Sequence, residues 1–307
     1  MKKTLLPLSI LFSLGITWGS GYAIARFATT HGVHPIGYTF WQSLGPAVLL
    51  SLFCLFKRRI SGLAARAPKL VPTQKIEHLH TPYKFYALCG LLGIAVPNTI
   101  MYYAAAHLPA SLLALVINTV PMMIYPLALL AKQESFNFRR FLALVITIVG
   151  LACLVVPNAH FSGQQAKWIL IALLTPLCFA LFANFVNPRR PANSQPLNLA
   201  AGMMIFSTLW LLPVVFSTHS FYSLWPLTLP GWVIILEMIL SSLGYVLLFK
   251  LLTLAGPVYY SLVDGVVAIT GLLWGVLLFQ ERFNVWQSIA VCCILGGIGL
   301  MSWMRKR

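Results

Sequence analysis

Long apolar stretches follow one another along the chain and are separated by short polar connections. Each stretch has about 20 mostly apolar residues, the length that an α-helix needs to cross a bilayer. The pattern predicts an all-α membrane protein with ten transmembrane helices. We place the spans at about 5–27, 35–56, 83–106, 109–131, 138–156, 166–187, 196–217, 231–253, 257–279 and 285–304.

A pentapeptide pattern recurs at corresponding places in the two halves. Gln133-Glu134-Ser135-Phe136-Asn137 precedes the fifth predicted helix, and Gln280-Glu281-Arg282-Phe283-Asn284 precedes the tenth. Because five crossings are an odd number, the second half must lie inverted relative to the first, as in many secondary transporters. We predict two inverted five-helix repeats, residues 1–156 and 166–304. The first contains a polar cytoplasmic loop at 57–82.

Composition and charge agree with a lipid environment. The chain is 59% hydrophobic and 8% charged, whereas soluble domains are about 25% charged. The net charge of +16 would suit a nucleic-acid partner, but most Lys and Arg residues fall in alternate connections and at the chain ends. That distribution is the positive-inside pattern. It predicts that both termini are cytoplasmic and that lipid rather than nucleic acid is the partner. The first apolar run, about 20 residues long, exceeds an ordinary signal core, and its removal would break the five-plus-five symmetry, so we expect an uncleaved first span.

Catalytic and metal-binding motifs are missing from the sequence. It contains no H-E-x-x-H, P-loop or G-x-S-x-G pattern, and its six cysteines lie in apolar segments without metal-ligand spacing. We therefore expect no enzyme, no cofactor and no metal. Without an ATP site, transport would be passive or driven by an ion gradient, with protons as the candidate coupling ion.

Three charged residues lie nearest the membrane interior within the predicted spans: Glu237, Lys250 and Asp264. A charge at a helix centre costs roughly 2.5–3.5 kcal/mol on the insertion scale, so these side chains should face the bundle interior or water. Lys250 and Asp264 flank a predicted turn at Ala255-Gly256, at depths that differ by about 5 Å. This spacing predicts a Lys250–Asp264 contact. The alternative is that Lys250 extends to the membrane surface.

Other polar and aromatic residues in the spans are candidates for lining a substrate pathway. Trp18 and Trp274 each lie in a G-x-x-W-G pattern, which serves close helix packing and also places a tryptophan beside the packing face. The remaining candidates are Tyr22, Trp41, Gln42, Asn98, Tyr102, Asn118 and Tyr245. Glu134 and Glu281 are interpreted differently, as negative charges at the start of the helix that follows each of them.

These features together resemble the EamA branch of the drug/metabolite transporter superfamily. The resemblance rests on Trp18-Gly19-Ser20, on Pro109-Ala110-Ser111 leading to Pro121, and on Glu134 and Glu281, which precede helices containing Gly150 and Gly297. It implies an inner-membrane carrier of amino acids, other small metabolites or drugs, often an exporter, with a central cavity between the repeats.

The expected function is export of amino acids or other small polar metabolites by alternating access, either secondary active or passive. Two alternatives remain open at this point: a facilitative channel of the same fold, and a non-transporting membrane scaffold or assembly protein. The sequence gives no prediction of the oligomeric state.

Overall fold

The computed structural model describes residues 2–64, 82–117, 119–130, 163–189, 195–260, 263–281 and 285–304, with short pieces between 132 and 153. All regular structure within these residues is helical. The helices are α1 (Lys2–Thr30), α2 (Pro35–Ala64), α3 (Pro82–Gly90), η1 (Leu91–Ala95), α4 (Val96–Ala105), α5 (Ala110–Ile117), α6 (Val120–Leu130), α8 (Gly163–Ala172), α9 (Leu174–Arg189), α10 (Pro196–Ser217), α11 (Leu229–Tyr260), α12 (Val263–Phe279) and α13 (Val285–Met304).

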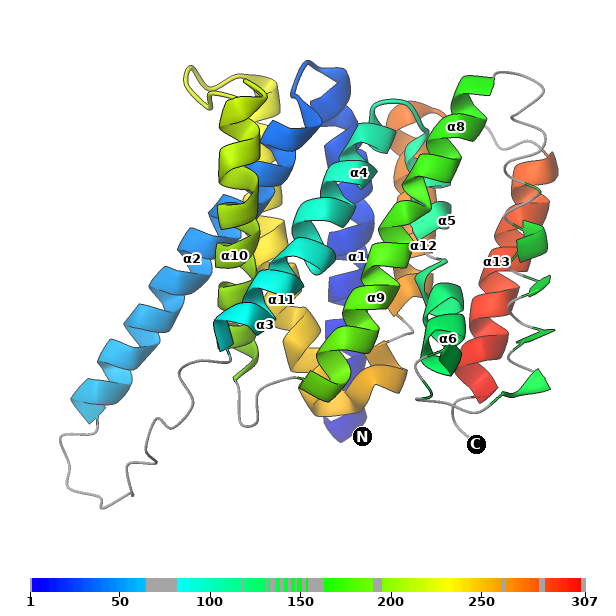
Figure 1. Ribbon diagram of the computed structural model, residues 1–307, viewed down its shortest axis with the longest axis horizontal. Helices are drawn as coiled ribbons and strands as arrows, with labels where there is room; N and C mark the ends of the chain where they lie inside the picture. Colours follow the sequence, from blue (N-terminus) through cyan, green and yellow to red (C-terminus); the bar gives the residue numbers. More distant parts are fainter. Residues whose placement is uncertain are drawn as a thin grey trace.

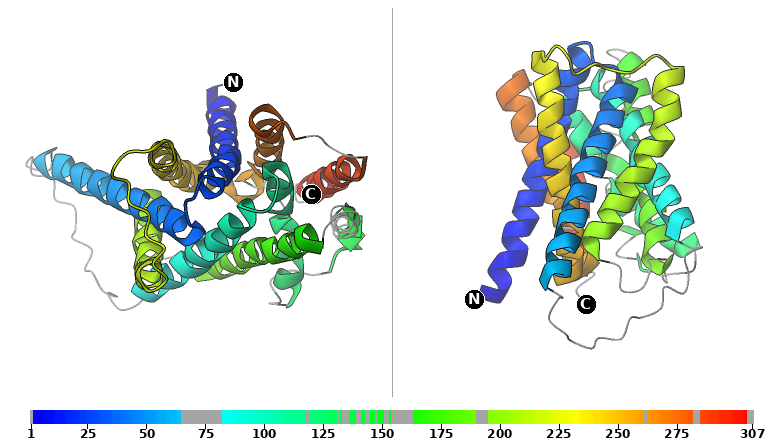
Figure 2. Two further views of the ribbon diagram at one scale, coloured as in Figure 1. Left: turned by 90° about the horizontal axis from the view of Figure 1, so that it is seen from above. Right: turned by 90° about the vertical axis from the view of Figure 1, so that its left-hand side faces the viewer.

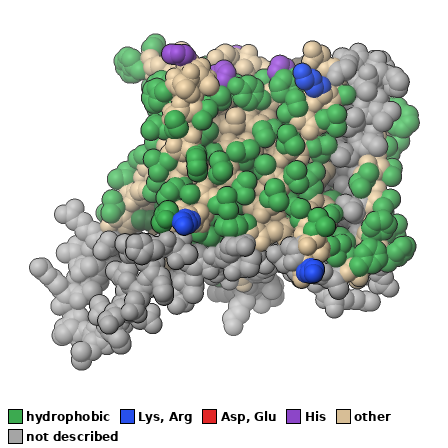
Figure 3. Space-filling view, in the orientation of Figure 1, with side chains coloured by type: hydrophobic (Ala, Val, Ile, Leu, Met, Phe, Trp, Pro, Cys, Tyr) green, Lys and Arg blue, Asp and Glu red, His purple; other side chains and the backbone are tan. Residues whose placement is uncertain are grey.

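Among the described residues, seven helical stretches are long and apolar enough to cross a membrane. They are Leu6–Thr30, Pro35–Phe56, Tyr83–Ala105, Ala110–Leu127, Gln164–Phe185, Pro196–Ser217 and Leu229–Leu251, and Gly265–Phe279 forms a shorter apolar helix. Each of the seven coincides with a predicted span. Hydrophobic side chains cover most of the described face in Figure 3, as expected for a surface in contact with lipid. The chain is a multi-pass membrane protein.

Helices from the two halves of the chain pack against one another. α1 packs mainly on α12 and α11, and α2 packs mainly on α10 and α11. Seen from above, α1 lies between α11 and α12 (Figure 2). The start of α1 and the end of α13 lie at the same edge of the bundle (Figure 1). The interior therefore forms where the halves meet.

Glycines in α1 allow its close approach to α12. A Cβ atom on Gly19 would lie 2.5 Å from the Thr270 Cβ and 2.8 Å from the Val267 carbonyl oxygen, and one on Gly15 would lie 2.5 Å from Val266. The first G-x-x-W-G pattern thus serves helix packing, one of the two interpretations given for it.

Prolines interrupt three of the long helical stretches. Pro97 has no N–H, and the π-helical turn η1 comes just before it, with the Val96 N–H bonded to the Leu91 carbonyl. The other two interruptions lie between α5 and α6, before Pro121, and between α8 and α9, before Pro176. The Thr175 hydroxyl donates to the Pro97 carbonyl over 3.0 Å. One hydrogen bond therefore joins two of these irregular regions.

The predicted turn at Ala255-Gly256 is wrong. Helix α11 continues through these residues to Tyr260, and α12 begins only at Val263. Pro257 removes one backbone donor, which bends a helix without necessarily ending it. In Figure 1 the last turns of α11 run along the edge of the bundle instead of continuing straight.

Candidate functional site

Four helices carry polar and aromatic residues spaced four apart, which places them on one face of each helix. These residues are Trp18 and Tyr22 in α1, Tyr38 and Gln42 in α2, Asn98 and Tyr102 in α4, and Glu237, Ser241 and Tyr245 in α11. We call this set the Glu237 cluster. Three of the helices come from the first half of the chain and one comes from the second, so the cluster lies between the halves.

Glu237 is the charged centre of the cluster and is only 5% exposed. Its Oε1 accepts hydrogen bonds from Ser241 Oγ (2.8 Å) and Gln42 Nε2 (3.2 Å). Asn98 Nδ2 in turn donates to Gln42 Oε1 over 2.8 Å. These bonds connect α11, α2 and α4 through one polar network.

The other carboxyl oxygen, Glu237 Oε2, has no hydrogen-bond partner among the described residues. Both carboxyl oxygens lie 3.7 Å from the place where a Cβ would stand on Gly21, so the carboxyl faces the bare backbone of α1. The hydroxyl of Tyr38, a side chain only 1% exposed, also lacks a partner within the described structure. A buried polar atom without a partner costs about 1–3 kcal/mol and needs an explanation.

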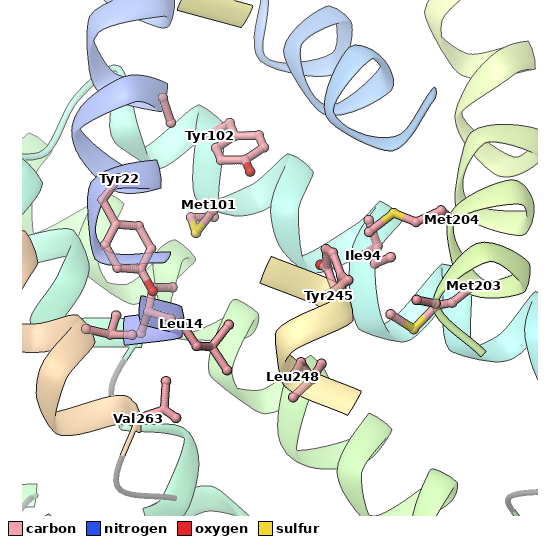
Figure 4. Packing of buried hydrophobic residues seen from close by; sticks show 14 of the residues in the cluster. Leu14, Tyr22, Ile94, Met101, Tyr102, Met203, Met204, Tyr245, Leu248 and Val263 are labelled. Atoms are coloured by element: carbon pink, nitrogen blue, oxygen red, sulfur yellow. The ribbon is translucent and has the colours of Figure 1, made fainter. Parts of the chain in front are cut away.

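Aromatic rings surround the carboxyl. Tyr38 and Tyr102 pack edge to face with their centroids 4.5 Å apart, and Trp18 and Tyr245 do so at 6.0 Å. Figure 4 shows Tyr22, Tyr102 and Tyr245 projecting from α1, α4 and α11 into a shared interior. A carboxylate among aromatic faces and hydroxyl groups is chemically suited to an ammonium group, which it can bind by charge, hydrogen bonds and cation–π contact.

The structure brings most of the predicted pathway residues together. Those within the Glu237 cluster are Trp18, Tyr22, Gln42, Asn98, Tyr102, Glu237 and Tyr245. Two tryptophans have other contacts. Trp41 Nε1 donates to the Tyr222 carbonyl (2.8 Å) in the α10–α11 connection, and Trp274 Nε1 donates to Ser20 Oγ (2.7 Å) between α12 and α1.

Lys250 is exposed at the surface of the bundle. The side chain of its predicted partner Asp264 lies outside the described residues, as does Asn118, so the Lys250–Asp264 contact stays a prediction. Tyr38 and Ser241 were not among the predicted site residues. Their positions, four residues from Gln42 and from Glu237, were the signal that could have identified them.

The interpretation of Glu281 needs correction. We expected its charge at the start of the helix that follows it. Instead, its carboxyl accepts hydrogen bonds from the backbone N–H groups of Ala110 (2.9 Å) and Ser111 (3.2 Å), at the start of α5. Negative charge is favoured at the N-terminus of any helix, including one from the other half of the chain. Glu134, the corresponding residue of the first pentapeptide, lies outside the described residues.

Comparison with known proteins agrees with this architecture. The sequence pattern of the EamA-like transporter family matches the chain twice, over residues 5–156 and 166–303. The chain belongs to the EamA-like transporter family. This result confirms the resemblance seen in the sequence, and it identifies the protein as a transporter of small molecules across a membrane.

The EamA-like chain also resembles individual proteins. Protein PecM of Dickeya dadantii is 26% identical over 210 residues, which cover 68% of this chain and 70% of that protein. An uncharacterized transporter of Clostridium kluyveri is 23% identical over 124 residues, covering 40% of this chain and 39% of that one. A protein of known crystal structure also aligns with this chain, and the alignment covers 100% of this chain and 99% of that one. The TM-score is 0.62 and the sequence identity is 16%, so the two proteins share the fold.

Proposed function

We propose that this EamA-like transporter moves small polar organic molecules with an amine group, including amino acids, through the Glu237 cluster. The observation that carries the proposal is a carboxyl buried between the two halves, with one oxygen lacking a partner among the described residues. A substrate ammonium group would donate to this oxygen and lie against the rings of the cluster.

Alternating access supplies the mechanism. The carboxyl belongs to α11 in the second half, whereas its partner Gln42 and the facing residue Gly21 belong to the first half. Movement of one half against the other would therefore separate Glu237 from Gln42 and Gly21 and open the site to one side of the membrane. With 5% exposure, Glu237 is enclosed in the present conformation.

The proposed topology has ten spans in two inverted repeats, with both termini cytoplasmic in an inner membrane. It is supported by the family match in each half and by the common edge at which α1 starts and α13 ends (Figure 1). The expected direction is export, as the resemblance to the family implies. Transport would be passive or coupled to an ion gradient, for which protons are the candidate ion.

A counterflow experiment tests the proposal. Liposomes containing the purified protein are loaded with unlabelled amino acids or simple amines, and uptake of the labelled compound is followed. We expect a transient overshoot, because a carrier exchanges internal for external substrate. Uptake to equilibrium without an overshoot would indicate a facilitative channel.

A thermal-stability screen against amino acids, amines, nucleosides and organic acids identifies the substrate class. A ligand that binds the folded state raises its melting temperature. The variant Lys250→Gln is a suitable control in this screen. Its exposed side chain lies outside the cluster, so the substitution should leave the ligand-induced shift in melting temperature unchanged. If amines neither stabilise the protein nor enter the liposomes, the proposed substrate class is wrong. If no compound of any class does so, a non-transporting scaffold becomes the better explanation.

A further inference from the structure

Glu281, just after the end of α12, joins three segments of the chain. Helix α12 ends at the edge of the bundle opposite the start of α1 (Figure 1). Besides the Ala110 and Ser111 N–H groups, the Ser111 hydroxyl donates to its carboxyl and Arg26 of α1 forms an ion pair with it. The Glu281 side chain is 9% exposed. Within the described structure the carboxylate thus has four donors, and all of these come from the other half of the chain.

The local fold after α12 directs this side chain inward. Gln280 has a positive φ of 52°, and the Glu281 N–H bonds back to the Gly275 carbonyl over 3.1 Å. This bond spans six residues, one more than the 6→1 bond of a Schellman motif, and like that motif it closes the helix C-terminus after a left-handed residue. A Cβ on Gly275 would lie 2.5 Å from Glu281 Oε2, so glycine leaves the space that the carboxyl occupies.

Arg26 continues the residue stripe of α1 that forms part of the Glu237 cluster. Trp18, Tyr22 and Arg26 are spaced four apart and therefore lie on one face of the helix. Arg26 stands about 6 Å further along the axis than Tyr22. Its guanidinium also packs over the Phe279 ring, 4.4 Å from the centroid. The Arg26–Glu281 pair consequently lies between the cluster and this edge.

We propose that Arg26, Glu281 and the start of α5 form a latch that closes the path from the Glu237 cluster to this edge. The inference rests on the proposed alternating-access function. Opening this side requires α1 and α5 to separate from the α12–α13 connection, and that separation breaks the ion pair and the hydrogen bonds at Ala110 and Ser111. In the proposed orientation the edge faces the outside.

The binding partners of the Glu281 carboxylate distinguish a latch from an ordinary helix cap. A cap serves the helix to which it is joined, whereas Glu281 binds the start of a helix in the other half and also the guanidinium of α1. Charge-assisted bonds are stronger than neutral ones, so they favour the closed state. Water at the edge can solvate both charges after release, which makes opening reversible.

Cysteine labelling in membrane vesicles tests the latch. Thr270→Cys places a reporter on α12 at its contact with Gly19, where Thr270 is 8% exposed. A membrane-impermeant maleimide is added from one side of the membrane at a time, and the protein without the reporter gives the background from native cysteines. We expect Glu281→Gln and Arg26→Gln to raise the labelling rate about tenfold from the latch side, since a hydrogen bond to a charged group is worth at least that factor.

Three further variants complete the test. Arg26→Lys keeps the charge and should give a smaller increase, and Ser111→Ala removes one donor for use if the stronger variants fail to fold. Trp210→Phe is the matched control, because it removes a hydrogen bond between the halves, from Trp210 Nε1 to the Ala87 carbonyl (3.0 Å), without touching the latch. It should leave labelling unchanged.

Two results would overturn the latch. One is an unchanged labelling rate in folded Arg26 and Glu281 variants. The other is an equal increase from both sides of the membrane, which indicates a generally loosened bundle. The assay needs no substrate, so a failure to find transported amines counts against the proposed function and leaves this result intact.

Discussion

Replacing Glu237 by glutamine should separate ligand binding from stability. Glutamine has the same shape, and its oxygen can still accept the hydrogen bonds from Ser241 and Gln42. Its amide group would take the place of Glu237 Oε2, which lacks a partner within the described residues. The substitution therefore removes the charge, replaces the unpartnered acceptor by an amide group for whose N–H donors no acceptor is described, and keeps the rest of the network.

The expected effects on stability and on binding have opposite signs. A buried neutral amide costs less than a buried negative charge, even though its N–H donors lack a described acceptor, so the free energy of unfolding should stay unchanged or rise by about 1 kcal/mol. An ammonium ligand would lose a charge-assisted hydrogen bond worth about 1.5–3 kcal/mol, so its affinity should fall about 10- to 150-fold.

Both effects can be measured on the same preparation. The melting temperature without ligand reports the stability, and calorimetry gives the affinity for the amine. Ser241→Ala is the control, because it removes one donor to Glu237 Oε1 and leaves the charge in place. Its affinity loss should be clearly smaller. Amine affinity within twofold of the original in Glu237→Gln would refute the assigned role, and so would a large drop in melting temperature, because the carboxylate would then be a structural element.

Two further predictions concern packing. Gly19→Ala places a Cβ 2.5 Å from the Thr270 Cβ and should lower the free energy of unfolding by about 1–3 kcal/mol in a thermal or denaturant assay; Gly265→Ala, with open space around it, should have little effect, and equal effects would contradict the packing argument. Thr175→Val removes the 3.0 Å bond to the Pro97 carbonyl and should cost about 1 kcal/mol in the same assay; an unchanged stability would mean that the bond does not stabilise these irregular regions.

Helix positions were largely predictable because the solvent of a membrane span is lipid along its whole length. Hydropathy alone located the seven helical stretches that the structure describes as long enough to span a membrane. The end of α11 was not predictable in this way. Gly256-Pro257 typically marks a turn, but a bent helix can accommodate a proline, and the surrounding packing decides between the two.

The candidate site was predictable in its members more than in its connections. Glu237 stood out because a charge in an apolar span is costly, and six of its neighbours stood out as polar or aromatic residues, five in other spans and Tyr245 in the same one. The bonds from Gln42 and Ser241 to one oxygen of Glu237, and the absence of a described partner for the other, depend on how α2 and α11 meet.

The sequence by itself determined that this is a multi-pass helical membrane protein with a repeated pentapeptide and a charge within a span, because these are properties of local composition and order. Only the tertiary structure decided which partners the charges have. Glu281 lies in sequence before α13, yet it binds the start of α5 and Arg26 of α1. Helix packing between distant segments sets those distances, and no local pattern contains them.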